Sequence, residues 1–515
     1  MESREGNGGE SVRQWAILMR EAFPGTRLQG IFSILCRMAT LPPMILEISR
    51  SLRAEGGQAF LVGGWVRDLE LMRLQEGSGI PDAGELDLEV YGLPAERLAS
   101  VLGRYGEVRL VGQSFAVYKL VPRQAGGGDA PAIDVSLPRR DTKVAPGHRG
   151  FEVQGDPSLS QKEATRRRDF TVNAMMYDPL ADRTIDLWGG RDDLRSRVLR
   201  AVDPSTFVED SLRVLRAVQF AARLDFAIDP ATVELCRRID LSDLPAERIW
   251  GELEKLLLKA ERPSIGLEWA DRLGVIASLF PELRALQGCP QEKEWHPEGD
   301  VWTHTLMAID QAKKEIEGLP KEKALAVLLA VICHDFGKPA TTAVVDGRIR
   351  SYDHEEAGIL PTRAFLDRLG VHTLRGYDLR EQVVQLVAHH LTPSHYFKNR
   401  ENVGDGAFRR LARKLEPDLL YRVSRADCLG RTGDFSTEAQ EWFIAKVRAL
   451  SVESRPPAPI LMGRHLLEMG IEPGPAIGRV TRAVYEMQLD GKVRDLEGAR
   501  REARRLLADV RQKVP

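Results

Sequence analysis

Cysteine is scarce in this sequence, and its few cysteines are isolated from one another. The five of them are Cys36, Cys236, Cys289, Cys333 and Cys428. No CxxC pair occurs, so the sequence predicts neither a disulfide framework nor a zinc ribbon.

An excess of either charge and a long apolar run are also lacking. The chain has 73 Lys+Arg against 75 Asp+Glu, a formal net charge of −2. Any contact with nucleic acid must therefore come from a local basic patch. No uninterrupted apolar stretch is long enough to span a bilayer, and the start, MESREGNGGES, lacks the features of a secretory signal. We expect no membrane contact and a cytoplasmic location.

Apolar periodicity divides the chain into a mixed first part and a helical remainder. Strand-like runs such as AFLVGG, LDLEVYG and AIDVSL occur before residue 140, and beyond about residue 204 the strands cease. Eight of the ten histidines lie between His296 and His395. The predicted fold is α+β, with an N-terminal extension (1–45), an α/β head with a mixed β-sheet (46–202), a helical neck and body (203–288), a histidine-rich helical domain (289–452) and a helical tail (453–515).

A glycine pair lies where a head strand passes into a helix. Gly63 and Gly64 let backbone amides approach a phosphate at a helix N-terminus, and Arg67 follows one turn later. Glycines that serve chain geometry alone are the alternative interpretation.

Acidic residues alternate along the next predicted strand. Glu85, Asp87 and Glu89 project from one face, where their mutual repulsion favours a divalent cation. Asp134, on a later strand, would complete a carboxylate triad. Two metal ions held about 3.5–4 Å apart can activate a hydroxyl and steady a leaving pyrophosphate. A solvated strand face is the alternative.

Five ordered motifs carry a family resemblance. LVGGWVRD with the acidic strand, RRRDFTVNAM, DLWGGRDDL, EDSLRVLRAVQF and ERIWGEL follow one another across roughly residues 60–252. In this order they resemble the class II bacterial tRNA nucleotidyltransferase (CCA-adding) and poly(A) polymerase family. The resemblance implies template-independent addition of CMP and AMP, from CTP and ATP, to the 3′ end of tRNA. It also implies Mg²⁺ held by Glu85 and Asp87.

The same resemblance implies roles for single residues. The residues expected to contact ribose and triphosphate are Gly63, Gly64, Arg67, Arg167, Arg168, Asp169 and Asn173. Those expected on the base-reading helix are Asp210, Arg213 and Arg216. A carboxylate there accepts from an exocyclic amine and a guanidinium donates to ring nitrogens, which favours cytosine and adenine. The motif thought to couple head movement to nucleotide exchange comprises Asp186, Gly190 and Asp193.

Two positions depart from the family pattern. Glu85 stands where the family usually has Asp, and Gln219 precedes Phe220 where Arg is common. These departures leave open the alternative that the head has lost its catalytic activity and only binds RNA.

The histidine-rich block contains an H…HD…D order of metal-ligand residues. Its members are His304, His334, Asp335 and Asp427. Imidazole and carboxylate from three helices suit a transition-metal site, and His354, His389 and His390 would add a second metal. The block resembles the HD phosphohydrolase domain. That resemblance implies phosphatase or phosphodiesterase activity on nucleotides or a 2′,3′-cyclic end, with Ni²⁺, Co²⁺, Mn²⁺ or Mg²⁺.

The sequence leaves several alternatives open. Poly(A) polymerases and enzymes restricted to adding C or A share the head motifs, and a hydrolase with a degenerate head belongs to another class. In the tail, eight Lys/Arg against four Asp/Glu at residues 492–513 give a local charge of +4, suited to tRNA phosphates. A solvated helix end would have the same charge pattern. The oligomeric state is left open between a monomer and a homodimer.

Overall fold

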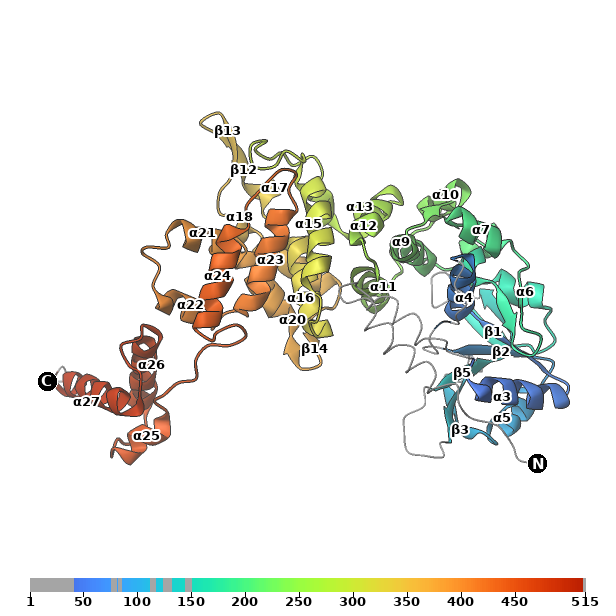
Figure 1. Cartoon of the computed structure of the whole chain (residues 1–515), viewed down its shortest axis with the longest axis horizontal. Helices are drawn as coiled ribbons and strands as arrows, with labels where there is room; N and C mark the ends of the chain where they lie inside the picture. Colours follow the sequence, from blue (N-terminus) through green and yellow to red (C-terminus); the bar gives the residue numbers. More distant parts are fainter. Residues whose placement is uncertain are drawn as a thin grey trace, which may run out of the picture. The chain divides into compact units, whose positions relative to one another are not determined.

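The computed structural model describes residues 41–75, 81, 86–111, 117–123, 132–143 and 151–512. It confirms the predicted α+β class, because a mixed sheet is followed by a largely helical region (Figure 1). The chain divides into two compact units, Met1–Val144 with Phe151–Ser196, and Ala145–Gly150 with Arg197–Pro515. The finer division into a neck, a histidine-rich domain and a tail stays a prediction.

The first unit is built on a seven-stranded sheet in the order β3-β4-β5-β2-β1-β8-β9. The strands are β1 (Gln58–Val62), β2 (Asp87–Tyr91), β3 (Gly106–Val111), β4 (Val117–Pro122), β5 (Ile133–Ser136), β8 (Met176–Asp178) and β9 (Arg183–Ile185). β2 and β5 run parallel, whereas the other neighbours are antiparallel. Leu61, Leu88 and Val135 are fully buried, as expected of the inward face of alternating strands.

Helices and one hairpin complete this unit. The helices are α3 (Pro43–Ala54), α4 (Gly64–Leu74), α5 (Ala95–Leu102), α6 (Gln161–Arg166), η1 (Thr171–Asn173) and α7 (Gly190–Ser196). The hairpin joins β6 (Arg139–Lys143) to β7 (Phe151–Gly155). β2 starts beside the end of β1, since Asp87 pairs with Val62. The turn after β1 therefore lies at the end of the sheet where β2 begins, next to Asp87.

The second unit opens with a group of helices that pack around α9. These elements are β10 (Val198–Leu199), α8 (Pro204–Phe207), α9 (Leu212–Leu224), β11 (Ala227–Ile228), α10 (Pro230–Arg238), α11 (Ala246–Lys259), α12 (Pro263–Arg272), α13 (Val275–Leu279) and α14 (Pro281–Leu286). α9 packs against α11 and α12. At Gly266 on α12 a Cβ would meet the side chain of Leu256 on α11, so glycine permits this close approach.

A larger helical group follows. Its helices are α15 (Val301–Glu315), α16 (Lys321–Cys333), α17 (Lys338–Thr341), α18 (His354–Ala357), α19 (Ile359–Arg368), α20 (Leu379–His389), α21 (Thr392–Lys398), α22 (Asp405–Leu411), α23 (Pro417–Leu429) and α24 (Glu438–Ala449). α16 packs against α15, α20 and α23, and residues 324–333 are all buried.

Two features of this region bear on the sequence-based expectations. By length and composition alone the segment Lys321–Thr341 could cross a membrane, although His334, Asp335 and Lys338 interrupt its apolar run. Because 83% of its apolar window is buried, it is a core helix. Strands also persist beyond residue 204, as β11, β12 (Thr342–Val345), β13 (Arg348–Ser351), β14 (Thr373–Leu374) and β15 (Tyr377–Asp378). Runs of two to four residues are too short to show alternation.

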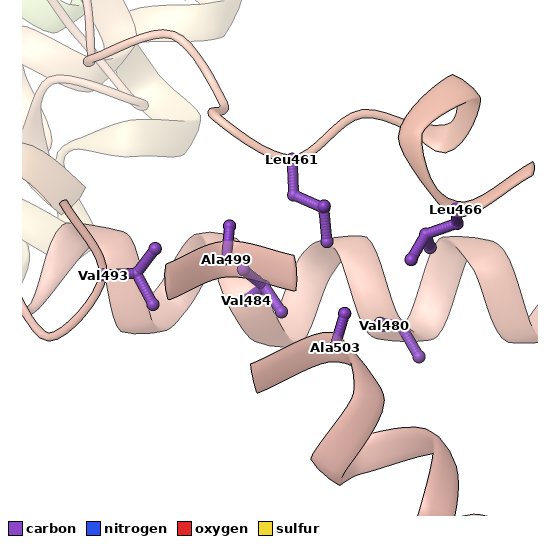
Figure 2. Packing of buried hydrophobic residues seen from close by; sticks show 7 residues of the cluster. All are labelled: Leu461, Leu466, Val480, Val484, Val493, Ala499 and Ala503. Carbon is purple, nitrogen blue, oxygen red and sulfur yellow. The ribbon is translucent and has the colours of Figure 1, made fainter. Parts of the chain in front are cut away.

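The last three helices share a small core of their own. They are α25 (Gly463–Glu468), α26 (Pro475–Leu489) and α27 (Leu496–Gln512). Figure 2 shows the buried residues that hold them together, Leu461, Leu466, Val480, Val484, Val493, Ala499 and Ala503. Ion pairs join α26 to α22, including Arg410 Nε to Glu486 at 2.9 Å. These helices of the predicted tail therefore pack against one another.

Candidate functional site

The glycine turn in the head lies beside a carboxylate and an arginine. Gly63 follows β1 with φ of +78°, a conformation that favours glycine. A Cβ on Gly63 would lie 3.5 Å from Asp87 Oδ2 and 3.9 Å from Arg168 Nη1. Gly64 begins α4. The structure therefore brings together three of the residues that the sequence assigned to nucleotide and metal binding.

Asp87 and Asp134 are neighbours across the parallel pair β2–β5. They are register partners, so their side chains emerge on the same face. Asp134 is about half exposed and lies 3.9 Å from Lys119 Nζ. Adjacent carboxylates at an accessible edge fit a hard divalent cation. Glu85, the other proposed ligand, lies outside the described residues.

Glu89 differs from the expectation that it joins a cation-binding face. It is fully buried, and its carboxylate accepts a hydrogen bond from Tyr91 Oη at 2.6 Å. Arg167 Nη2 and Arg168 Nη2 lie 3.4 Å and 3.6 Å from Glu89 Oε1. Burial acts to raise the pKa of Glu89, but the positive charges of Arg168 and Arg167 outweigh it and hold the pKa below its usual value. Glu89 is therefore the counter-ion of two arginines.

A buried network positions Asn173. Arg67, 2% exposed, donates from Nη1 to Asn173 Oδ1 at 3.0 Å and pairs with Asp68. Asn173 Nδ2 donates to Asp169 Oδ1 at 3.2 Å, and the same oxygen accepts the Phe170 amide. Arg67 thus has protein partners, and it fastens η1 to α4.

In the predicted head-motion motif, Asp186 caps the start of α7, whereas Gly190 and Asp193 contact η1. Asp186 accepts hydrogen bonds from the Gly190 and Arg191 amides, both at 2.9 Å, at the start of α7. A Cβ on Gly190 would meet the Thr171 carbonyl oxygen. Asp193 Oδ2 accepts from Thr171 Oγ1 at 2.6 Å. A displacement of α7 would therefore be passed directly to η1, which ends at Asn173.

The predicted base-reading residues belong to the second unit. Asp210 Oδ1 accepts from the Leu212 amide at 3.1 Å at the start of α9. Arg213 donates to the Thr206 carbonyl oxygen at 2.8 Å and lies 5.8 Å above the Phe207 ring. Both residues are half-buried, so each is held in place while part of its polar surface stays accessible.

Two other polar residues of α9, Arg216 and Gln219, differ in burial. Arg216 is half-buried, with its guanidinium 5.1 Å from the Phe220 ring centroid. Gln219 is buried at 2% exposure, and no described residue accepts a hydrogen bond from its Nε2. The departure from the family pattern at this position therefore lies inside the helical packing. Leu212 and Leu215 on the same helix are core residues.

In the histidine-rich region, ligand-type atoms form a first buried cluster from His304, His334 and Asp427. They come from α15, the end of α16 and α23. His304 Nε2 lies 3.0 Å from Asp427 Oδ1 and 3.3 Å from His334 Nε2. The predicted H…HD…D residues are thus brought together.

A second buried cluster adjoins the first and contains Asp335, His354 and His390. Asp335 Oδ1 lies 3.5 Å from His354 Nε2, and His354 Nε2 lies 3.2 Å from His390 Nε2. His389 belongs to no cluster among the described residues, which corrects its expected role.

The histidine tautomers fit bound metal ions. Nδ1 of each of three rings lies 2.7–2.8 Å from the backbone carbonyl oxygen three residues earlier, in His334, His354 and His390. Each Nδ1 must therefore carry the proton, which leaves lone pairs on the Nε2 atoms. The Nε2 lone pairs of His354 and His390 lie 3.2 Å apart and cannot hydrogen-bond to each other, whereas a shared cation satisfies both.

Asp335 supports the same conclusion. It is 1% exposed, and neither of its oxygens accepts a well-aligned hydrogen bond from a described residue, although Lys338 Nζ lies 2.8 Å away. Burial acts to raise the pKa of Asp335, but the neighbouring His334 ring and the Lys338 ammonium outweigh it and hold the pKa well below its usual value. A buried, ionised carboxylate whose oxygens accept no well-aligned hydrogen bond is suited to bind a cation.

Sequence reasoning missed a supporting carboxylate, Glu298. Its Oε1 lies 3.0 Å from His304 Nδ1 and 2.8 Å from His296 Nδ1. This is the carboxylate–histidine–metal arrangement that orients a ligating imidazole. Burial lowers the pKa of His296 to about 4, so that ring is neutral at pH 7. Glu298 lies in a loop before α15, where spacing carries no signal.

A cavity of about 540 Å³ opens onto both clusters. Asp335, His354, His390 and Asp427 line it, together with four cationic side chains, Lys338, Arg350, Lys398 and Arg431. Lys338 and Arg431 pair with Asp335 and Asp427. Arg350 and Lys398 form no ion pair with a described residue, which leaves positive charge for an anionic substrate.

Comparison with known proteins agrees with this geometry. The chain matches the poly A polymerase head domain over residues 59–200, the probable RNA and SrmB- binding site of polymerase A over 225–286, and the HD domain over 301–431. These matches define the class: a metal-dependent nucleotidyltransferase head joined to a metal-dependent HD domain.

Individual relatives identify the family within this class. The chain is 35% identical over 386 residues to the multifunctional CCA protein of Pasteurella multocida, covering 73% of this chain and 84% of that protein. It is 36% identical over 387 residues to that of Xanthomonas campestris pv. campestris, covering 73% and 85%. The chain belongs to the class II family of CCA-adding enzymes and poly(A) polymerases, in the branch that carries an HD domain.

Solved structures share the fold. The Bacillus stearothermophilus CCA-adding enzyme in complex with CTP superposes with a TM-score of 0.59 at 21% identity, over 92% of this chain and 100% of that one. The Thermotoga maritima CCA-adding enzyme complexed with tRNA gives 0.54 at 21% identity, over 93% and 98%.

Proposed function

We propose that the head adds CMP and AMP, from CTP and ATP, to the 3′ end of tRNA without a nucleic-acid template. The observation that carries the proposal is the grouping of the Gly63 turn, Asp87 and Arg168, with Asp134 beside Asp87. The relatives named multifunctional CCA proteins, and the solved CCA-adding enzymes with CTP or tRNA, support it. A cytoplasmic location is proposed with it.

In this reaction the terminal hydroxyl oxygen of the RNA forms a bond to the α-phosphorus. The bond to the leaving pyrophosphate breaks, and the hydroxyl proton passes to solvent. Magnesium bound by Glu85, Asp87 and Asp134 would supply Lewis-acid stabilisation of the attacking and leaving oxygens. Arg167 and Arg168 would bind the triphosphate, and Asp210 and Arg213 would select cytosine or adenine.

The test is incorporation of labelled CTP and ATP into three tRNA transcripts, ending before CCA, after C and after CC. We expect two Cs and then one A, and loss of incorporation in Asp87→Ala. Addition at a single stage would indicate a restricted enzyme, and long A tracts a poly(A) polymerase. Absence of incorporation would overturn the proposal and favour a head that only binds RNA.

We also propose a second activity, hydrolysis of a phosphate ester by the HD domain. The paired clusters beside a cationic cavity support it. Water oxygen would bond to phosphorus, the P–O bond to ribose would break, and the leaving oxygen would take a proton, as in opening a 2′,3′-cyclic phosphate. Nickel, cobalt, manganese or magnesium, held by His304, His334 and Asp427 and by Asp335, His354 and His390, would lower the pKa of a bound water.

The tail is proposed to contribute to tRNA binding. α27 carries half of the basic excess of residues 492–513, and several of its arginines, among them Arg504 and Arg505, are exposed. Exposed arginines on one helix match the charge of an RNA backbone.

A further inference from the structure

Two aromatic side chains line the HD cavity together with the metal-ligand residues. Trp295 is 46% exposed, a large value for tryptophan, and Phe435 is half-buried. Phosphate chemistry at metal ions requires neither ring. No ring or guanidinium of the described residues stacks on Trp295, so its indole face is available to a ligand.

Each ring is connected to the first metal cluster through one chain of contacts. Trp295 precedes His296, whose Nδ1 shares Glu298 Oε1 with the ligand His304. On the other branch, Phe435 lies under Arg431, with the guanidinium 5.5 Å from the ring centroid.

That guanidinium also lies 3.5 Å from the ligand Asp427. Both rings are therefore held near the metal ligands by side chains that contact those ligands.

The charges of the same cavity indicate where a phosphate would lie. Arg350 and Lys398 line it without an ion-pair partner among the described residues. Glu292, the remaining lining carboxylate apart from the ligands, accepts the Ile349 amide at 3.0 Å. The cavity thus combines an anion-binding wall with apolar ring surface, a pairing that fits a phosphate ester carrying a flat heterocycle.

We infer that Trp295 and Phe435 form a stacking platform for the nucleobase of the ester hydrolysed in the HD domain. The platform would let the proposed hydrolase site distinguish a nucleoside phosphate or an RNA end from phosphate esters that lack a base. This inference rests on the proposed hydrolase activity. Stacking tolerates every base, because each has a π-face, so the platform selects nucleotides without selecting sequence.

The test compares adenosine 2′-monophosphate with glycerol 2-phosphate, using the full chain with manganese. Trp295→Ala is expected to raise the KM for the adenosine ester about tenfold, in line with the loss of one base–aromatic stack. Hydrolysis of glycerol 2-phosphate should be unchanged, and Trp295→Phe should retain most of the affinity. The matched control is Tyr352→Ala, which removes an exposed aromatic that does not line the cavity. Equal effects on both esters, or none on the adenosine ester, would overturn the inference.

Calorimetric titration of adenosine 2′-monophosphate into the full chain separates this inference from the proposed activity. If wild type binds the nucleotide tenfold more tightly than Trp295→Ala but hydrolyses neither ester, the hydrolase proposal fails and the platform stands. If the wild type and Trp295→Ala bind equally, or neither binds, the platform is refuted whatever the activity.

Discussion

Glu89→Gln is the most informative single change in the head, because it keeps shape and removes charge. The glutamine can still accept the Tyr91 hydrogen bond, which is 2.6 Å long in the wild type. At an effective dielectric constant of about 20, each Glu89–Arg attraction at 3.4–3.6 Å is on the order of 5 kcal/mol before desolvation is subtracted. Breaking one side of a buried pair costs about 3–5 kcal/mol. Since Arg167 and Arg168 are 21% and 16% exposed, solvent recovers part of this. We therefore expect Glu89→Gln to lower the free energy of unfolding by roughly 2–3 kcal/mol.

Calorimetry of the full chain measures this loss. For a unit of this size about 1 kcal/mol lowers Tm by roughly 2–4 °C, so the head transition should fall by about 4–12 °C. The matched control is Glu107→Gln, which breaks an exposed pair with Arg109 and should leave the head transition almost unchanged, because solvent screens that pair. Nucleotide KM should also rise, because Arg167 and Arg168 lose the group that orients them.

The pH dependence of the free energy of unfolding is an independent test of the same ion pair. The pKa of Glu89 is lower in the folded state than in the unfolded state. Its contribution to stability is therefore present above the unfolded pKa, near 4.3, and is lost as pH falls through the folded pKa. The stability gap between wild type and Glu89→Gln should shrink below about pH 4. A Tm loss no larger than that of Glu107→Gln at pH 7 would refute the reasoning.

Two further changes test the packing of α7 and the metal clusters. Gly190→Ala should destabilise the head by about 1–3 kcal/mol in denaturant unfolding, because the new Cβ would meet the Thr171 carbonyl oxygen. The control is Gly251→Ala, which has open space around it and should be neutral or stabilising. An equal response of the two variants would contradict this. Manganese at a hundredfold excess over its Kd should stabilise the HD region by about 2.7 kcal/mol, reversed by EDTA. His334→Ala should weaken that effect, and full retention would exclude the clusters as the binding site.

Much of the head was predictable because its signals are local. The glycine turn, the alternating strand and the ordered motifs each occupy a few consecutive residues. These signals predicted that Gly63 and Asp87 belong to one site. Alternation states which side chains share a face, but not how deep that face lies. Glu89 was therefore assigned to the cation-binding face, although Arg167 and Arg168 bury it as a counter-ion.

The HD region shows a different limit. The H…HD…D order predicted the residues that the structure groups in the first cluster, since adjacent His and Asp after an apolar helix are hard to explain as core. Adjacent histidines at a helix end point about 100° apart, so sequence could not separate His390, which joins the second cluster, from His389. Glu298 approaches from a loop, and loop geometry is not encoded in periodicity.

The measurement that tests the account most directly is a paired assay of Asp87→Ala and His334→Ala. Each full-length variant is assayed for incorporation into a tRNA transcript ending before CCA and for hydrolysis of a 2′,3′-cyclic phosphate. Two independent sites predict that Asp87→Ala loses incorporation and keeps hydrolysis, whereas His334→Ala does the reverse. Loss of hydrolysis in Asp87→Ala, or of incorporation in His334→Ala, with both variants folded, would contradict two separate active sites.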